Sequence, residues 1–241
     1  MSKIFYYELK RLLFNKFFFC LFFINGFFAW YTLTTDTIAG IAHTAPFSPW
    51  SFSAYLATIM PIVILTVLFL LSFYYSKKEK QVKTLTCATP VNTIHYALVR
   101  MAVIALGFLL LSVLIIGMSV FFYAFFFEFY KYTVFIMPCL ITILPCFVLI
   151  LGLGMILGRV NTGLLYALML VSLAMNFIQL PGAFDFFGKR FYSSTPMSML
   201  LAADGEPAFV LSGTFLAARA FYFVIGTIIL IVGVQKEIIN K

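Results

Sequence analysis

Residues 75–100, YSKKEKQVKTLTCATPVNTIHYALVR, decide the fold of this chain because they are a polar interruption between two long apolar runs. Charged side chains crowd the start of this stretch, although only 10% of the whole chain is charged. The charged positions are Lys77, Lys78, Glu79, Lys80 and Lys83. A connection this long and this charged exceeds what is needed to join two neighbouring helices, so we expect it to have a structure of its own.

The spacing of the less polar residues predicts a short helix inside this stretch. Val82, Leu85 and Thr89 recur with the period of one helix face, which leaves the lysines on the opposite side. Pro90 cannot continue a helix and disfavours helical angles at the residue before it. Asn92 or the threonine after it then caps the next helix. The expected shape is a short helix, a turn and a re-entry into an apolar run.

The composition is that of an integral membrane protein. Of the 241 residues, 63% are hydrophobic, and the mean hydropathy is +1.08. Apolar runs of about 20 residues, the length that a helix needs to cross a bilayer, recur along the chain. The short alternating segments of a membrane β-barrel do not occur in the sequence. We therefore expect an all-α integral membrane protein in which residues 1–241 form a single transmembrane domain.

The apolar runs predict six transmembrane helices. Five runs have clear bounds, at residues 17–34, 52–75, 101–127, 132–158 and 209–234. The remaining run, fifth in chain order, follows a tight turn at Arg159 and Asn161 and ends near Leu180.

Three further segments lie outside the expected spans. Residues 1–16 place apolar and basic side chains on opposite helix faces, which predicts a helix lying in the membrane interface. Residues 77–93 are the charged loop. Residues 181–208 are too polar to span a membrane and too aromatic to stay free in water, so we expect a helix or hairpin on the outer surface.

Basic residues are distributed unevenly over the expected loops. All but four of the 16 Lys and Arg residues fall within the termini or on the side of residues 77–93; the exceptions are Lys131, Lys189, Arg190 and Arg219. The positive-inside rule therefore puts the charged loop and both termini in the cytoplasm. This distribution accounts for the net charge of +8 without a nucleic-acid partner.

The charged loop resembles the cytoplasmic loop of ABC type-2 transporter permeases. The matching pattern is an acidic residue, a Thr-Leu pair, a small-Thr-Pro turn, a polar residue, an aromatic residue and a basic residue. These are Glu79, Thr84-Leu85, Ala88-Thr89-Pro90, Asn92, Tyr96 and Arg100. The order of elements extends the resemblance over essentially the whole chain, as one permease domain. It implies a connecting helix at residues 1–16, a coupling helix in residues 77–93, and short extracellular helices before the last span.

In that family the coupling helix sits in a groove of the ATP-hydrolysing subunit. The resemblance and the helix face together imply the following ATPase contacts: Lys78, Glu79, Val82, Leu85, Ala88, Thr89, Pro90 and Asn92. The alternative for the lysines is a basic loop that only fixes the membrane topology.

The function implied by the resemblance is that of the membrane subunit of an ATP-driven exporter in a bacterial plasma membrane. No GxxxxGK[ST] sequence occurs, so ATP hydrolysis is expected on a separate ABC ATPase subunit, and no enzyme activity or cofactor is expected here. Six spans are half a transporter in this family, which implies a homodimer or a heterodimer with a sister permease. The many phenylalanines favour a lipophilic or amphipathic substrate: a peptide toxin of the bacteriocin or phenol-soluble modulin kind, a lipid or a drug. The alternative is a non-transporting membrane protein, such as an assembly, immunity or sensor subunit.

Five residues are candidates for the translocation pathway because proline and polar side chains are unusual in apolar spans: Pro138, Pro145, Asn176, Gln179 and Arg219. Packing between helices is the alternative for each of them, and for Arg219 an ion pair or a side chain that reaches the interface. Gly154 and Gly158 form a small-xxx-small pair, which predicts the close approach of another helix.

A metal site is not expected. His43 and His95 are the only histidines, and the predicted topology separates them by the membrane. The four cysteines form no CxxC pair. Paired carboxylates are also missing from the expected spans, which argues against a proton-relay transporter.

Overall fold

The structure, a computed structural model, describes residues 2–41, 44–76, 79, 93–178, 185–199 and 207–239. All the elements that these residues form are helical, which confirms the predicted all-α class. In chain order they are α1 (Ser2–Leu12), α2 (Lys16–Thr32), the π-helical η1 (Leu33–Thr37), α3 (Pro49–Tyr74), α5 (Thr93–Phe127), the 3-10 helix η2 (Tyr132–Phe135), α6 (Ile136–Val160), α7 (Thr162–Ala174), α8 (Lys189–Ser198) and α9 (Gly213–Ile239).

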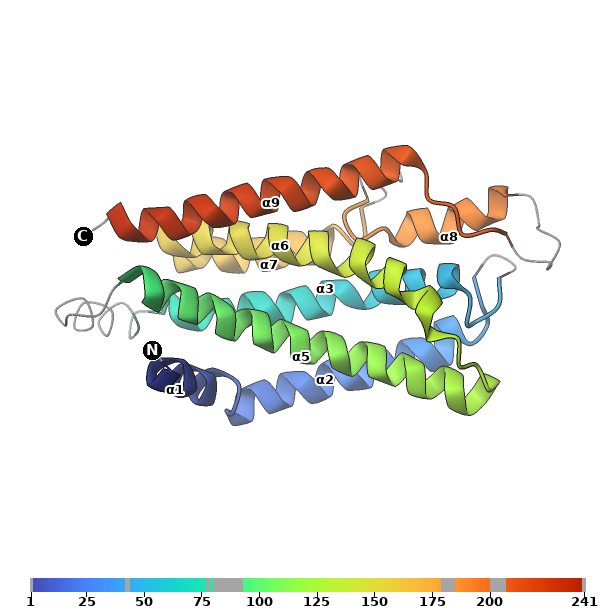
Figure 1. The fold of residues 1–241 in the computed structure, drawn as a ribbon, viewed down its shortest axis with the longest axis horizontal. Coiled ribbons are helices and arrows are strands. Elements are labelled where there is room, and N and C mark those ends of the chain that lie inside the picture. The colour runs from blue at the N-terminus through green and yellow to red at the C-terminus, as the bar shows by residue number, and fades with distance from the viewer. Residues whose placement is uncertain are drawn as a thin grey trace.

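The long helices run side by side along the longest axis of the molecule (Figure 1). Helix α9 forms one edge, α6 and α7 come next, α3 and α5 follow, and α2 lies at the opposite edge. The two termini lie at the same end, beside α1, the end of α3 and the beginning of α5; we call this the terminal end. Helix α8 lies at the other end, which we call the distal end.

Helix α3 is the core of the bundle. Of its apolar stretch 72% is buried, against 17% for α9. Its start is well specified, because the Ser48 side chain accepts a hydrogen bond from the N–H of Ser51 and Pro49 stands at the first helical position. Near this start the large side chains of Trp50, Phe52 and Tyr55 are fully buried. The other helices therefore assemble around α3.

Within the described part of the chain, five helices are long and apolar enough to cross a membrane: Lys16–Thr37, Pro49–Tyr74, His95–Phe127, Tyr132–Val160 and Gly213–Gln235. They correspond to five of the six predicted spans, and they are compatible with a multi-pass membrane protein. The remaining predicted span, the one ending near residue 180, contains α7, which has 13 residues. At about 1.5 Å per residue, α7 is shorter than the hydrocarbon core of a bilayer.

The N-terminal helix is shorter than predicted. It ends at Leu12 instead of reaching residue 16, because Asn15 caps α2 by accepting a hydrogen bond from the N–H of Phe17. The predicted apolar face is confirmed, since Leu12 and Leu13 are buried while Lys10 is exposed.

Glycines of α6 allow close contact with two neighbouring helices. A Cβ atom at Gly154 would lie 2.6 Å from Leu71 of α3, and one at Gly158 would lie 2.5 Å from the ring of Tyr75. The packing role predicted for this pair is thereby confirmed. On another face, a Cβ at Gly152 would lie 2.9 Å from the carbonyl oxygen of Gly226, so α6 and α9 approach backbone to backbone.

Candidate functional site

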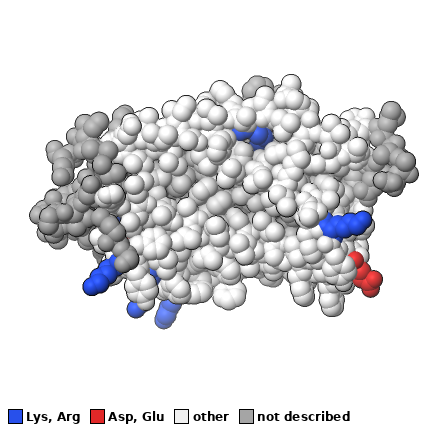
Figure 2. Space-filling view, viewed as in Figure 1, with Lys and Arg blue, Asp and Glu red and all other residues white. Residues whose placement is uncertain are grey.

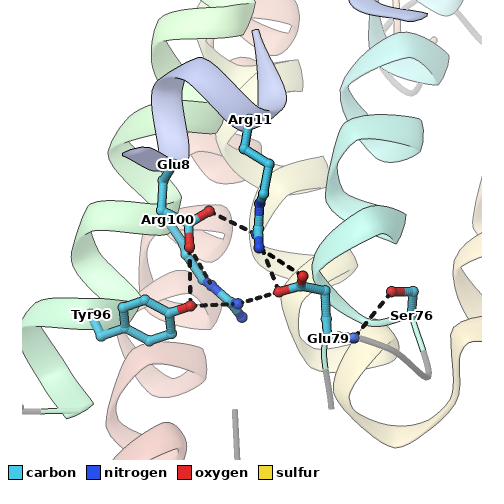
Figure 3. A network of polar contacts seen from close by, with 6 residues as sticks. All are labelled: Glu8, Arg11, Ser76, Glu79, Tyr96 and Arg100. Atoms are coloured by element: carbon cyan, nitrogen blue, oxygen red, sulfur yellow. Dashed lines mark hydrogen bonds and ion pairs between the residues drawn. The ribbon is translucent and has the colours of Figure 1, made fainter. Parts of the chain in front are cut away.

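Five side chains from three segments meet at the terminal end in what we call the charge cluster: Glu8, Arg11, Glu79, Tyr96 and Arg100. Figure 3 shows Glu8 and Arg11 reaching down from α1, Tyr96 and Arg100 from α5, and Glu79 lying between the two arginines. The contacts join residues 68 and 88 positions apart in the sequence. The cluster therefore fastens α1, α5 and the start of the charged loop to one another.

Glu79 is the centre of the charge cluster. Its Oε1 lies 2.8 Å from Nη1 of Arg11, and its Oε2 lies 3.1 Å from Nη2 of the same residue. The same Oε2 also accepts a hydrogen bond from Nη2 of Arg100 at 2.5 Å. A carboxylate gripped by two guanidinium groups, one of them in a bidentate fork, has a fixed orientation.

Glu8 completes the cluster from the side of α1. Its Oε2 lies 2.8 Å from Nη2 of Arg11, one turn further along the helix. Its Oε1 accepts a hydrogen bond of 3.0 Å from the hydroxyl of Tyr96 and lies 3.9 Å from Nε of Arg100. The Tyr96 hydroxyl in turn accepts a hydrogen bond of 2.7 Å from Arg100. Each charged group thus has at least one partner of opposite charge.

The charge cluster is neutral and mostly shielded from water, and Arg11, with 31% of its side chain exposed, is its most open member. Glu8 is only 2% exposed, and the side chains of Arg100 and Glu79 are 11% and 14% exposed. Burial alone would lower the pKa of Arg11, but the carboxylates of Glu8 and Glu79 raise it above its ordinary value. The ring of Tyr74 at the end of α3 covers one side, with its centroid 4.7 Å from the Arg100 guanidinium carbon. Paired charges in such a site are costly to separate.

The sequence around Glu79 explains how this residue is positioned. The backbone N–H of Glu79 donates a hydrogen bond to Oγ of Ser76 at 3.4 Å. Ser76-x-x-Glu79 is the spacing of a helix-capping pair, in which the serine satisfies a free N–H of the first turn. Beside it, Oγ1 of Thr162 donates to the carbonyl of Tyr75 at 2.8 Å, which ties the beginning of α7 to the end of α3.

A second buried cation, Arg219 of α9, lies nearer the distal end and has a different environment. Arg219 is only 3% exposed. Nη1 donates to the carbonyl of Phe186 and lies 3.4 Å from Sγ of Cys146, and Nη2 donates to the carbonyl of Asp185 at 2.9 Å. Its guanidinium carbon lies 4.6 Å from the ring centroid of Phe215. We call Arg219, Cys146, Asp185 and Phe186 the Arg219 site.

The segment before α8 is shaped to receive this arginine. Gly188 has a φ of +85°, and a Cβ atom there would lie 2.6 Å from Nη2 of Arg219, so glycine is needed for both reasons. The Asp185 carboxylate accepts a hydrogen bond of 2.6 Å from the N–H of Arg190 and so caps α8. The Tyr192 hydroxyl pairs with Thr142 of α6 at 2.9 Å, and burial raises its pKa to about 12. Helices α6, α8 and α9 are joined at this place.

A cavity of about 270 Å³ adjoins the Arg219 site. Asn176 and Asp185 line it together with Lys189 and Arg190. The structure thus brings the predicted pathway residue Asn176 close to the segment that binds Arg219. Asn176 Oδ1 is buried and has no hydrogen-bond partner among the described residues.

The structure assigns Arg219 a packing role, because its donors bind backbone carbonyls and a thiol inside the chain. The sequence offers Glu128, Asp204 and Glu206 as ion-pair partners for Arg219; Asp204 and Glu206 lie outside the described residues, and Glu128 is exposed whereas Arg219 is buried. Its predicted role in the pathway stays a prediction.

The two prolines of α6 differ from each other. Pro138 lies in the first turn of the helix, where a missing N–H removes no intrahelical hydrogen bond, whereas Pro145 lies in the interior. A hydrogen bond inside α6 is therefore lost at Pro145 alone. Both prolines are buried, and their predicted pathway role stays a prediction.

Several predicted site residues lie outside the described residues. These are Lys78, Val82, Leu85, Ala88, Thr89, Pro90 and Asn92 of the loop, and Gln179. Of the predicted ATPase contacts, Glu79 alone is described. Its carboxylate is held by two arginines of this chain, so an ionic contact with another subunit would have to compete with them.

Sequence reasoning missed Glu8, Arg11 and Tyr74 as members of one site with Glu79. A signal was present, because the chain has only eight acidic residues and Glu8 stands one helical turn before Arg11. It also missed the backbone carbonyls that bind Arg219. Every residue has such a carbonyl, so no sequence pattern marks the ones that bind.

Among the described residues, no group of three or more His, Cys, Asp or Glu side chains is arranged to hold a metal ion. No family model, curated protein or solved structure matches this chain. The functional argument therefore rests on the charge cluster, the Arg219 site and the loop pattern.

Proposed function

We propose that this chain is the membrane-spanning permease subunit of an ATP-driven ABC exporter. Residues 77–93 would dock on a separate ATPase subunit, and two permease chains, identical or related, would enclose the path of a lipophilic or amphipathic substrate. The termini and the charge cluster would lie on the cytoplasmic side of a bacterial plasma membrane, and the segment with α7 would supply a sixth crossing.

The observation that carries this proposal is the attachment of Glu79. The loop that resembles a coupling helix begins at a carboxylate bound to Arg11 of α1 and Arg100 of α5. A displacement of the loop would therefore pull on two helices at once, through contacts that are short, charged and partly buried. Exporters that switch by rigid-body movement of helices need a connection of this kind.

A site-specific cross-link tests the proposal. A photoreactive amino acid at Leu85 in living cells should form an adduct with a protein that contains a P-loop, identified by mass spectrometry of the adduct. The matched control is the same amino acid at Tyr130, which is 67% exposed at the distal end and should give no such adduct.

Two substitutions in the loop then separate docking from coupling. Leu85→Asp should release the ATPase from the purified complex, because it buries an unpaired charge in the contact. Pro90→Ala should retain the ATPase while lowering the substrate-dependent hydrolysis of ATP, because the contact survives and the turn softens. If Leu85 gives no ATPase adduct and Leu85→Asp changes neither retention nor export, the loop is a topological anchor and the alternative of a non-transporting protein takes over.

A further inference from the structure

An apolar groove lies on the outside of the bundle near the terminal end. Its volume is about 410 Å³, and its walls come from α1, α2 and α5 and the turn between the first two. Leu9 and Leu13 line it from α1 and the turn, Phe18 and Phe22 from α2, and Leu106 and Leu110 from α5. The lining is almost entirely apolar, so the groove has no polar group to orient a water-soluble ligand.

The apolar walls remain open to the surroundings. Phe14 is 66% exposed, Phe19 47% and Leu110 43%. Such a cluster of exposed aromatic and aliphatic side chains around a hollow marks a place where an apolar partner is bound. A flexible acyl chain fits a hollow of this volume that is bounded by three helices.

Two lysines are close in sequence to residues that line the groove. Lys10 follows the wall residue Leu9, and Lys16 stands between Phe14 and Phe18; both lysines are exposed. Figure 2 shows Lys and Arg side chains gathered over α1 and the beginning of α2, while the surface between the two ends of the molecule is almost free of charge. Glu8, the one acidic residue of α1, does not offset them because it is buried and bound to Arg11.

From these observations we infer that the groove is a binding site for one anionic phospholipid, with an acyl chain along the apolar walls and the phosphate beside Lys10 and Lys16. The apolar lining suits an acyl chain, and the neighbouring lysines suit the anionic headgroup to which that chain is joined. A second copy of this chain is a poorer occupant, because it would bring the same lysines together. The inference requires that the chain lies in a membrane, and it does not depend on the exporter function.

Native mass spectrometry of the purified protein in detergent tests the site, with palmitoyl-oleoyl phosphatidylglycerol and the matching phosphatidylcholine as probes. We expect one phosphatidylglycerol to be retained in preference to phosphatidylcholine. Leu110→Trp should abolish this retention by filling the groove. The matched control is Leu109→Trp, since Leu109 is also exposed on α5 (53%) but does not line the groove.

The lysines are tested in the same measurement. Lys10→Gln with Lys16→Gln should weaken phosphatidylglycerol retention by about thirtyfold, at about fivefold for each cation near an anionic headgroup. Lys131→Gln, an exposed lysine at the distal end, should leave retention unchanged. Thermal unfolding of every variant shows whether a loss comes from misfolding.

Three outcomes would overturn the inference. Equal retention of both lipids would remove the headgroup selection. Equal behaviour of Leu110→Trp and Leu109→Trp in a folded protein would remove the groove as the place of binding. An efficient disulfide between two copies of a Leu110→Cys variant in native membranes would make a second chain the occupant.

Discussion

The charge cluster and the Arg219 site bury arginines in two different ways. Arg11 and Arg100 share two carboxylates that come from segments far apart in the sequence. Arg219 has backbone carbonyls of two adjacent residues, Asp185 and Phe186, as its partners. The first arrangement joins charged side chains of three segments, and a change of charge can break it. The second holds one short backbone segment against α9, and it depends on the shape of that segment.

This difference bears on function. A loop that transmits movement needs a connection that is strong but can rearrange, which the paired charges of the cluster provide. A segment that closes the far end of a bundle needs a fixed position, which carbonyl ligands and a glycine with positive φ provide. We therefore expect substitutions to have different signatures at the two sites.

The largest effect is expected for Glu79→Lys. It places a third cation beside Arg11 and Arg100 and removes one of the two carboxylates that they share. Breaking a buried pair in this way costs about 3–5 kcal/mol of unfolding free energy. Equilibrium unfolding in mixed micelles measures the loss, and Glu128→Lys, an exposed site at the distal end, is the control with an unchanged value. If Glu79→Lys were as stable as the control, the cluster would not hold the three segments together.

The next effect concerns Arg219. Arg219→Met leaves the carbonyl of Asp185 without its Arg219 donor and the carbonyl of Phe186 with the Cys146 thiol as its remaining donor, which should cost about 2–3 kcal/mol. Arg219→Lys should recover only part of this, because an ammonium cannot present the planar fork of a guanidinium. Limited proteolysis should show the loss as faster cleavage near α8.

This comparison separates the two arrangements. For a cation held by charge alone, Arg219→Lys would be as stable as the original protein. That result would make the Arg219 site equivalent to the charge cluster and would remove the distinction drawn above.

A smaller effect is expected where α9 meets α6, because this contact positions Arg219. A Cβ at Gly226 would lie 2.6 Å from the Cα of Leu149, so Gly226→Ala should push the helices apart and cost about 1–2 kcal/mol. Gly233→Ala on the same helix is the matched control, since its nearest neighbour would be 3.7 Å away. Thermal unfolding of the two variants should differ by several degrees, and equal values would show that α9 can shift freely along α6.

The sequence predicted the helical class and the five long apolar helices because both follow from composition and run length. It also predicted the contact of Gly154 and Gly158, since small residues four apart have one dominant use in helix pairs. It failed where partners come from distant segments. Nothing in residues 75–100 shows that α1 supplies Arg11 to Glu79, while the expected contact of Glu79 with another subunit stays a prediction. Arg219 was expected to reach an interface or an acidic side chain, and carbonyl partners leave no residue pattern to detect.

The smallest effect sharpens the description of the charge cluster itself. Tyr74 is 5% exposed, and its hydroxyl has no hydrogen-bond partner among the described residues, while its ring lies 4.7 Å from the Arg100 guanidinium. If the ring is what matters, Tyr74→Phe keeps the contact with the cation and removes an unsatisfied buried group, so stability should change by less than about 0.5 kcal/mol or increase slightly. Tyr96→Phe should behave differently, because the Tyr96 hydroxyl bonds both Glu8 and Arg100, and its loss should cost about 1–2 kcal/mol. The unfolding free energies of both variants, measured in the same micelles, show which of the two hydroxyls contributes to stability. A loss for Tyr74→Phe as large as that for Tyr96→Phe would mean that the Tyr74 hydroxyl has a partner of its own, and the cluster would then extend to α3 by a hydrogen bond as well as by ring contact.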